Sequence, residues 1–193
     1  MNSQTEHISL NNPRYPARLA QRLGVDAPAL LSVLGNLDFL ALPKTALFCS
    51  AKCPGSVIPP TYDQAAQWRD AGRCVISGFH SPVERECLQI LLRGDAPVIL
   101  CPARGMLERF PAQWDIASSG GQMLILSCFP EHERRVTTEL AARRNELVAA
   151  LADEVFIAHA TAGGQLEALT RRLGAWGVPI ICLGSHRREI SAG

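Results

Sequence analysis

Short apolar runs alternate with helical patterns along most of the chain, and this alternation restricts the possible folds more than any other feature. The runs are nearly continuous in apolar residues, as in strands of a parallel sheet that helices cover on both faces. Six strands are predicted, at residues 45–49, 73–77, 97–101, 122–127, 154–159 and 179–183. Helices are predicted between them at 61–71, 82–93, 134–151 and 165–176, with a weaker pattern at 105–118.

This order of elements predicts an α/β fold, a Rossmann-like three-layer sandwich with a mostly parallel sheet of about six strands. Residues 43–193 would form that domain, and residues 1–42 an N-terminal arm with a short helical extension. Within this extension the first twelve residues are polar and without periodicity, so we expect a loose arm. Leu19 and Leu23 precede Gly24 and predict a short helix. Residues 27–42 are expected to form a helical turn, a tight turn where Gly35-Asn36 breaks the apolar run, and a lead-in to the first strand.

Composition excludes some classes of function. The chain has 193 residues and a net charge of +1, so no overall basic field draws it to nucleic acid, and any such binding needs a local patch. No apolar stretch approaches the 18 residues of a membrane span, and the polar start does not resemble a signal peptide. We therefore expect a cytoplasmic protein without membrane contact.

The seven cysteines are dispersed, with no C-x-x-C pair. Cys49 and Cys53 have no second pair of ligands at a spacing typical of zinc sites. The cysteines are interpreted as reduced thiols of a cytoplasmic protein. No metal site and no cofactor is predicted.

The turn after the second predicted strand has the pattern of an anion site. Ser77-Gly78 breaks the apolar run, Ser81 is suited to cap a helix, and Glu84 completes a capping box with it. Such a turn directs backbone N–H groups and the positive end of a helix dipole at one place, where a phosphate could bind. The alternative is an ordinary turn without a ligand, because most α/β proteins contain such turns.

Polar and small residues also follow the other predicted strands. The carboxyl ends of parallel strands meet at one edge of the sheet, so these residues would converge on one crevice. His80 could instead be a capping or surface residue, and His159 a buried, hydrogen-bonded histidine. Paired arginines on a helix are usually solvated. The candidate phosphate-binding or nucleic-acid-binding residues are Ser50, Ala51, Lys52, Ser77, Gly78, Phe79, His80, Arg104, Arg144, Asn145, His159, Gly163 and Gly164.

Several of these segments together resemble the DNA-processing DprA/Smf family, within a wider superfamily that includes the lysine-decarboxylase-like (LOG) proteins. The resemblance covers roughly residues 15–183 and concerns the Rossmann-like domain. The matching segments are Tyr15-Pro16, Leu34-Gly35-Asn36, Ser77-Gly78, Arg144-Asn145 and His159-Ala160 with Gly163-Gly164. Three positions depart from the family pattern: Ser50-Ala51-Lys52 replaces G-S-R, the residues from His80 to Glu84 replace the G-I-D segment, and His159 replaces the acidic residue that closes the fifth strand.

The resemblance implies a protein that binds single-stranded DNA or a nucleotide phosphate, in recombination or DNA uptake, with a recombinase as a possible partner and a homodimer as its state. An alternative is a nucleotide-binding sensor or a LOG-like nucleotide phosphoribohydrolase. Gly163-Gly164-x-x-Glu167 is similar to part of the LOG loop, and Glu167 with Arg144 would then be the catalytic residues. A catalytic role is otherwise not expected.

Overall fold

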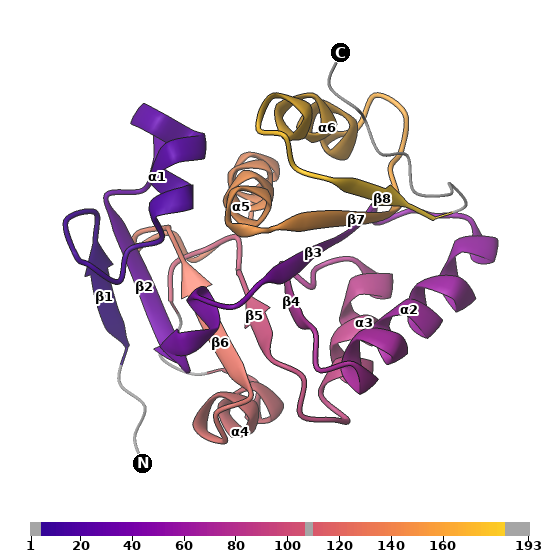
Figure 1. The fold of residues 1–193 in the computed structure, drawn as a ribbon, viewed down its shortest axis with the longest axis horizontal. Coiled ribbons are helices and arrows are strands. Elements are labelled where there is room, and N and C mark those ends of the chain that lie inside the picture. Colours follow the sequence, from indigo (N-terminus) through magenta and orange to yellow (C-terminus); the bar gives the residue numbers. More distant parts are fainter. Residues whose placement is uncertain (1–4, 107–109, 184–193) are drawn as a thin grey trace.

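A computed structural model describes residues 5–106 and 110–183. Eight strands form one sheet in the order β1-β2-β6-β5-β4-β3-β7-β8 (Figure 1). From β6 to β8 all neighbouring strands are parallel, whereas β2 runs antiparallel to β6 and β1 antiparallel to β2. The strands are β1 (Glu6–Ser9), β2 (Leu30–Gly35), β3 (Lys44–Cys49), β4 (Cys74–Ser77), β5 (Val98–Leu100), β6 (Met123–Ser127), β7 (Glu154–His159) and β8 (Ile180–Cys182).

Helices cover both faces of the sheet, which gives the three predicted layers (Figure 1). Alternate residues of a strand enter different cores: in β6, Leu124 and Leu126 pack with α1, α5 and α6, whereas Met123 and Ile125 pack with α2, α3 and α4. The helices are α1 (Ala17–Leu23), α2 (Ile58–Asp70), α3 (Pro82–Leu91), α4 (Ala112–Ser119), α5 (Thr138–Leu151) and α6 (Gln165–Ala175), with 3-10 turns η1 (Gly24–Asp26), η2 (Leu37–Leu40) and η3 (Gly55–Val57).

The predicted fold class is confirmed, and the six predicted strands are the six parallel ones. The strand count was wrong because β1 and β2, which extend the sheet, lie in the segment expected to be an arm and a helical extension. In β1 the side chain of Ile8 is the single buried one, so the strand has little apolar pattern. Gly35 was interpreted as a break, but it belongs to β2, where a Cβ would lie 2.1 Å from the Met123 carbonyl oxygen. The short helix predicted at Leu19 and Leu23 is α1.

The order in which parallel strands are added to the sheet reverses at β3, and this reversal positions the functional site. From β3 the chain moves outward through β4, β5 and β6, and then returns to add β7 and β8 on the other side of β3. The loops that follow β3 and β7 therefore leave the sheet in opposite directions. A crevice at such a switch point is where open α/β sheets bind ligands.

Candidate functional site

A pocket with a volume of about 430 Å³ opens at the switch point, beyond the carboxyl ends of β3 and β7. The loop after β3, the first turn of α3, the side of α5 and the start of α6 form its walls. Of the residues predicted from sequence, the structure brings seven together here: Ser50, Ala51, Lys52, His80, Arg144, Asn145 and Gly164. Ser81 and Glu84, predicted as the capping box of the turn before α3, line it too. Sequence reasoning missed the other lining residues, which are Cys49, Ala141, Thr161, Gln165 and Leu166.

Ser50 joins the two loops that leave the switch point. Its backbone N–H donates to the His159 carbonyl oxygen at 2.9 Å, and its hydroxyl accepts from the Thr161 N–H at 3.0 Å. The loop that carries the exposed Lys52 is therefore tied to the loop that leads into α6. This arrangement places a cation beside the start of a helix.

The turn before α3 forms as predicted but is closed by the protein itself. The Glu84 carboxylate accepts the backbone N–H groups of His80 at 2.8 Å and Ser81 at 3.1 Å, and its other oxygen accepts from Cys49 N–H at 2.9 Å. The Ser81 hydroxyl accepts from Glu84 N–H, so the capping box is complete. Because a buried carboxylate holds these donors, they are not open to a phosphate.

Ser77, Gly78 and Phe79 lie behind the pocket and do not line it. The Ser77 hydroxyl donates to the Leu47 carbonyl oxygen at 2.8 Å and accepts from Phe79 N–H at 3.1 Å. A Cβ at Gly78 would lie 1.4 Å from an Arg144 guanidinium nitrogen. A side chain at this position would displace the Arg144 guanidinium, so packing against this arginine favours glycine here.

Arg144 is a buried cation at the back of the pocket. Its side chain donates to the Cys101 carbonyl oxygen at 3.2 Å and to the Asn145 side-chain oxygen at 2.8 Å. Burial lowers the pKa of Arg144, while the nearby charge of Glu84 acts in the opposite direction. The bond from Arg144 also fixes the Asn145 amide, because the oxygen must face the donor and the NH₂ group is left to donate elsewhere.

The start of α6 is open, in contrast to the start of α3. Gly164 is the N-cap, and no side chain caps the helix there. The Glu167 carboxylate accepts from the Gly163 N–H, one position before the cap. Among the described residues, no acceptor meets the backbone N–H groups of Gln165 and Leu166, which line the pocket. These donors and the helix dipole form an anion-binding position.

Arg104, His159 and Gly163, the remaining predicted residues, do not line the pocket. Arg104 follows β5, and its carbonyl oxygen accepts from the Ser127 hydroxyl at 2.6 Å. His159 is half-buried at the end of β7. Glu167 is exposed and bound to Gly163, so it does not meet Arg144 in the pocket as the LOG-like alternative requires.

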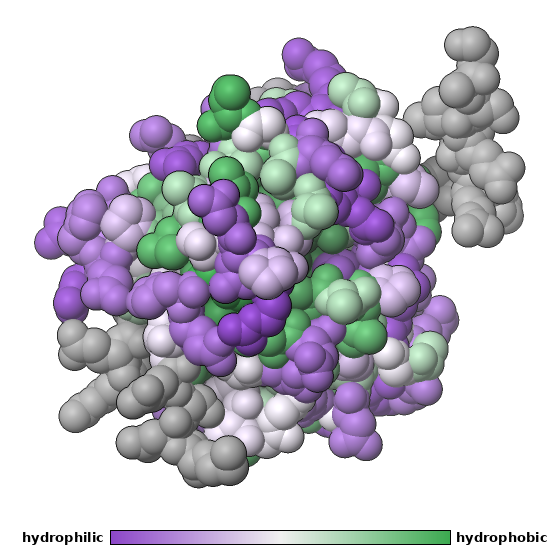
Figure 2. All heavy atoms as spheres, turned by 60° about the vertical axis from the view of Figure 1, so that its left-hand side comes forward, coloured by the Kyte–Doolittle hydropathy of each residue, from purple (hydrophilic) through white to green (hydrophobic). Residues whose placement is uncertain are grey.

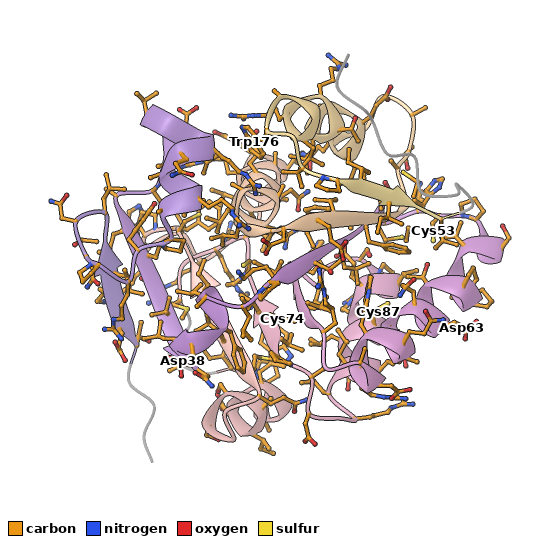
Figure 3. All side chains as sticks on the ribbon, viewed as in Figure 1. Asp38, Cys53, Asp63, Cys74, Cys87 and Trp176 are labelled. Atoms are coloured by element: carbon orange, nitrogen blue, oxygen red, sulfur yellow. The ribbon has the colours of Figure 1, made fainter. Side chains whose placement is uncertain are left out.

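Metal-binding clusters, disulfides and membrane-spanning helices are absent from the described residues. Within residues 5–106 and 110–183, no three His, Cys, Asp or Glu side chains lie together in a way that could hold a metal ion. No disulfide joins the cysteines there, and those labelled in Figure 3 come from separate elements. None of the helices in this part of the chain has the length and hydropathy that crossing a membrane requires.

Comparisons with known proteins add the context of a family. Residues 6–170 match the family model described as DNA recombination-mediator protein A. A comparison with curated protein sequences gives no match.

Among solved structures, DNA processing protein A (DprA) from Streptococcus pneumoniae is similar, with a TM-score of 0.79 and 22% identity over 96% of this chain. The chain spans 65% of that protein. DNA processing protein A from Helicobacter pylori, described by its single-stranded DNA binding mode, has a TM-score of 0.76 and 21% identity over 98% of this chain and 86% of its own. The molybdenum cofactor binding protein from Rippkaea orientalis has a TM-score of 0.52 and 14% identity, with 75% of this chain and 77% of its own covered. At these identities the structural likeness shows the fold.

Proposed function

The chain belongs to the DNA recombination-mediator protein A family, and from this premise we propose that it binds single-stranded DNA in the pocket between β3 and β7. One observation carries the proposal: the uncapped start of α6 and the exposed Lys52 line the same pocket. A backbone phosphate at the Gln165 and Leu166 N–H groups would accept hydrogen bonds and lie beside a cation. Its charge would face the helix dipole.

Asn145 and Arg144 would support this phosphate from α5. Arg144 is held by Cys101 and Asn145 and lies near the Glu84 carboxylate, so it orients the Asn145 amide rather than making a mobile contact of its own. The Asn145 NH₂ group would donate to a phosphate or sugar oxygen. A fixed donor needs little ordering when the ligand binds, which favours affinity.

The closed start of α3 favours a strand over a free nucleotide. Glu84 occupies the second anion position of the pocket, so a nucleotide with several phosphates would meet a carboxylate there. No Phe, Tyr or Trp is among the described residues that line the pocket, so neither a free base nor the bases of a strand would stack on an aromatic ring there. Affinity would then come from several backbone phosphates along a strand. The homodimer and the recombinase partner implied by the family resemblance stay predictions.

The test compares a labelled oligo-dT strand with unlabelled dTMP as competitor, by fluorescence anisotropy. We expect oligo-dT to bind orders of magnitude more tightly than dTMP, with a log–log salt dependence of roughly −0.7 per phosphate neutralised. Lys52→Ala should weaken binding by about 1–3 kcal/mol, since it removes a charge-assisted contact.

Arg93→Ala is the matched control, because Arg93 is an exposed cation on the turn after α3 and outside the pocket. It should leave the affinity for oligo-dT nearly unchanged. The site is one for free nucleotides if dTMP displaces the labelled strand as effectively as unlabelled oligo-dT does, when both competitors are compared at the same total concentration of nucleotides. Equal affinity of Lys52→Ala and the unaltered protein would place the DNA elsewhere.

A further inference from the structure

A second and larger hollow, of about 980 Å³, lies beyond the end of β6. It is bounded by the loop between α1 and β2, the loop after β6, and α5. Helix α5 separates it from the pocket at the switch point, since Arg144 and Asn145 line that pocket while Glu139 and Arg143 line this hollow. The DNA-binding proposal uses none of the residues that line it.

The lining of this hollow is strongly acidic. It holds five carboxylates and one arginine, so we call it the acidic groove, defined by Asp26, Glu131, Glu133, Glu139, Glu146 and Arg143. The Arg143 guanidinium carbon lies 5.7 Å from the centre of the Phe129 ring, over its face. These charges would repel a nucleic acid or an anionic membrane.

Three of the carboxylates form no ion pair within the described structure. Arg172 pairs with Glu146 at 2.6 Å and approaches Asp26 at 4.0 Å. Within the residues that the structure describes, Glu131, Glu133 and Glu139 form no ion pair. They are therefore available to a cation from outside.

Apolar side chains are exposed at the same corner. Val25 and Leu30 line the acidic groove and are 102% and 48% exposed. Leu10 is 46% exposed, and its N–H donates to the Ala29 carbonyl oxygen in the same loop. Figure 2 turns this side of the molecule forward and shows apolar surface interspersed with hydrophilic side chains. Exposed apolar side chains beside charged ones can contribute to the binding of another protein.

We propose that the acidic groove binds a segment of a partner protein in which apolar side chains are flanked by lysine or arginine. Apolar side chains of that segment would cover Val25 and Leu30, and its cations would pair with Glu131 and Glu139. A neutral apolar segment would desolvate these carboxylates without pairing them, which is unfavourable. Since α5 lies between the two sites, DNA and the partner segment could be held at the same time.

The probe is a labelled synthetic peptide of about 15 residues with leucine and lysine at helical spacing, compared with a peptide in which glutamate replaces lysine. Fluorescence anisotropy should show saturable binding of the lysine peptide, weaker as salt rises, and none of the glutamate peptide. The double substitution Glu131→Lys/Glu139→Lys should lower the affinity for the lysine peptide by about tenfold or more, and Val25→Asp should lower it by a similar factor.

Matched controls make the same chemical changes elsewhere. Asp63→Lys/Glu86→Lys reverses two charges on α2 and α3, where Figure 3 shows Asp63 at the outer side of the molecule. Ile116→Asp places a charge at an apolar side chain of α4 that is 71% exposed. Both controls should bind the lysine peptide like the unaltered protein, and the groove variants should not lose affinity for oligo-dT.

Three results would overturn the proposal. The first is no binding of the lysine peptide at low salt. The second is equal loss of binding in the groove variants and in the controls, which would mean a diffuse charge effect. The third is Val25-dependent binding to anionic phosphatidylserine vesicles with no effect of the groove variants on the peptide, which would identify a membrane surface.

Discussion

Two helices begin at the same edge of the sheet, α3 after β4 and α6 after β7, and both follow a turn that contains glycine. At α3 the chain supplies its own anion, because the Glu84 carboxylate accepts three backbone N–H groups, one from the end of β3 and two from the turn before α3. At α6 the N-cap is Gly164, which has no side chain to offer. A glycine turn at a helix start is thus an anion site only if no nearby side chain already fills it.

The largest effect on stability is expected when the carboxylate that holds the start of α3 is removed. Glu84→Gln removes the buried charge and leaves at least one backbone N–H facing an NH₂ group instead of an acceptor. We expect it to lower the free energy of unfolding by about 3 kcal/mol. Urea unfolding followed by tryptophan fluorescence measures this loss. Glu86→Gln, on the same helix and half-buried, is the control and should change stability by less than about 0.5 kcal/mol.

If Glu84→Gln proves as stable as Glu86→Gln, the carboxylate does not hold the α3 turn. The two helix starts would then differ only in their sequences and not in how they are closed.

A smaller loss is expected at Gly78, behind the closed turn. Gly78→Ala adds a Cβ where the Arg144 guanidinium lies, 1.4 Å from one of its nitrogens. Overpacking of this kind costs about 1–3 kcal/mol of unfolding free energy. Gly174→Ala is the control, since a Cβ at Gly174 meets no atom within 4 Å and alanine favours a helix. Equal stability of the two variants would show that Arg144 moves aside at no cost.

A carboxylate can be added beside the uncapped N-terminus of α6, as Glu84 provides one at α3. Thr161 is exposed and lines the pocket near Gly164. Thr161→Asp should weaken oligo-dT binding by about tenfold, because a carboxylate beside the α6 N-terminus competes with phosphate, and should leave stability nearly unchanged. Thr161→Asn has a similar shape without the charge and should bind more tightly than Thr161→Asp. Equal binding by the two would place the phosphate away from α6.

The smallest effect concerns a carboxylate at the opposite edge of the sheet. Burial by itself would raise the pKa of Asp153, but the Lys44 N–H at 2.8 Å and the paired Arg18 lower it below its ordinary value. A lowered pKa in the folded state gives stability that is present above the unfolded pKa, about 3.9, and is lost as the pH falls through the folded pKa.

The unfolding free energies of the unaltered protein and Asp153→Asn should therefore differ most near neutral pH. Because Asp153 is only partly buried, we expect a difference of about 1 kcal/mol or less. The difference should shrink below about pH 4. If the difference in unfolding free energy stays constant across the whole pH range, the charge of Asp153 contributes nothing to stability. Of these two carboxylates, only the buried one, Glu84, would then stabilise the fold through its charge.

The sequence by itself determined the six parallel strands, the layers and the capping of α3. Each depends on residues close in the chain: continuous apolar runs form buried strands, and Ser81 with Glu84 forms a capping box within one helical turn. The sequence did not reveal β1 and β2, because a short antiparallel edge strand such as β1 buries a single side chain, and Gly35 looks like a break until β6 lies beside it.

Only the tertiary structure decided which of the predicted site residues meet. Glu84 reaches Cys49, which is 35 positions away, and Arg144 reaches Cys101, which is 43 positions away. Those contacts close the first glycine turn and place Arg144 against Gly78, while the Gln165 and Leu166 N–H groups after the second glycine turn stay open in the pocket that Lys52 lines. A local pattern fixes where backbone N–H groups point. Whether a ligand or the protein itself accepts from them depends on side chains brought in from distant strands and helices.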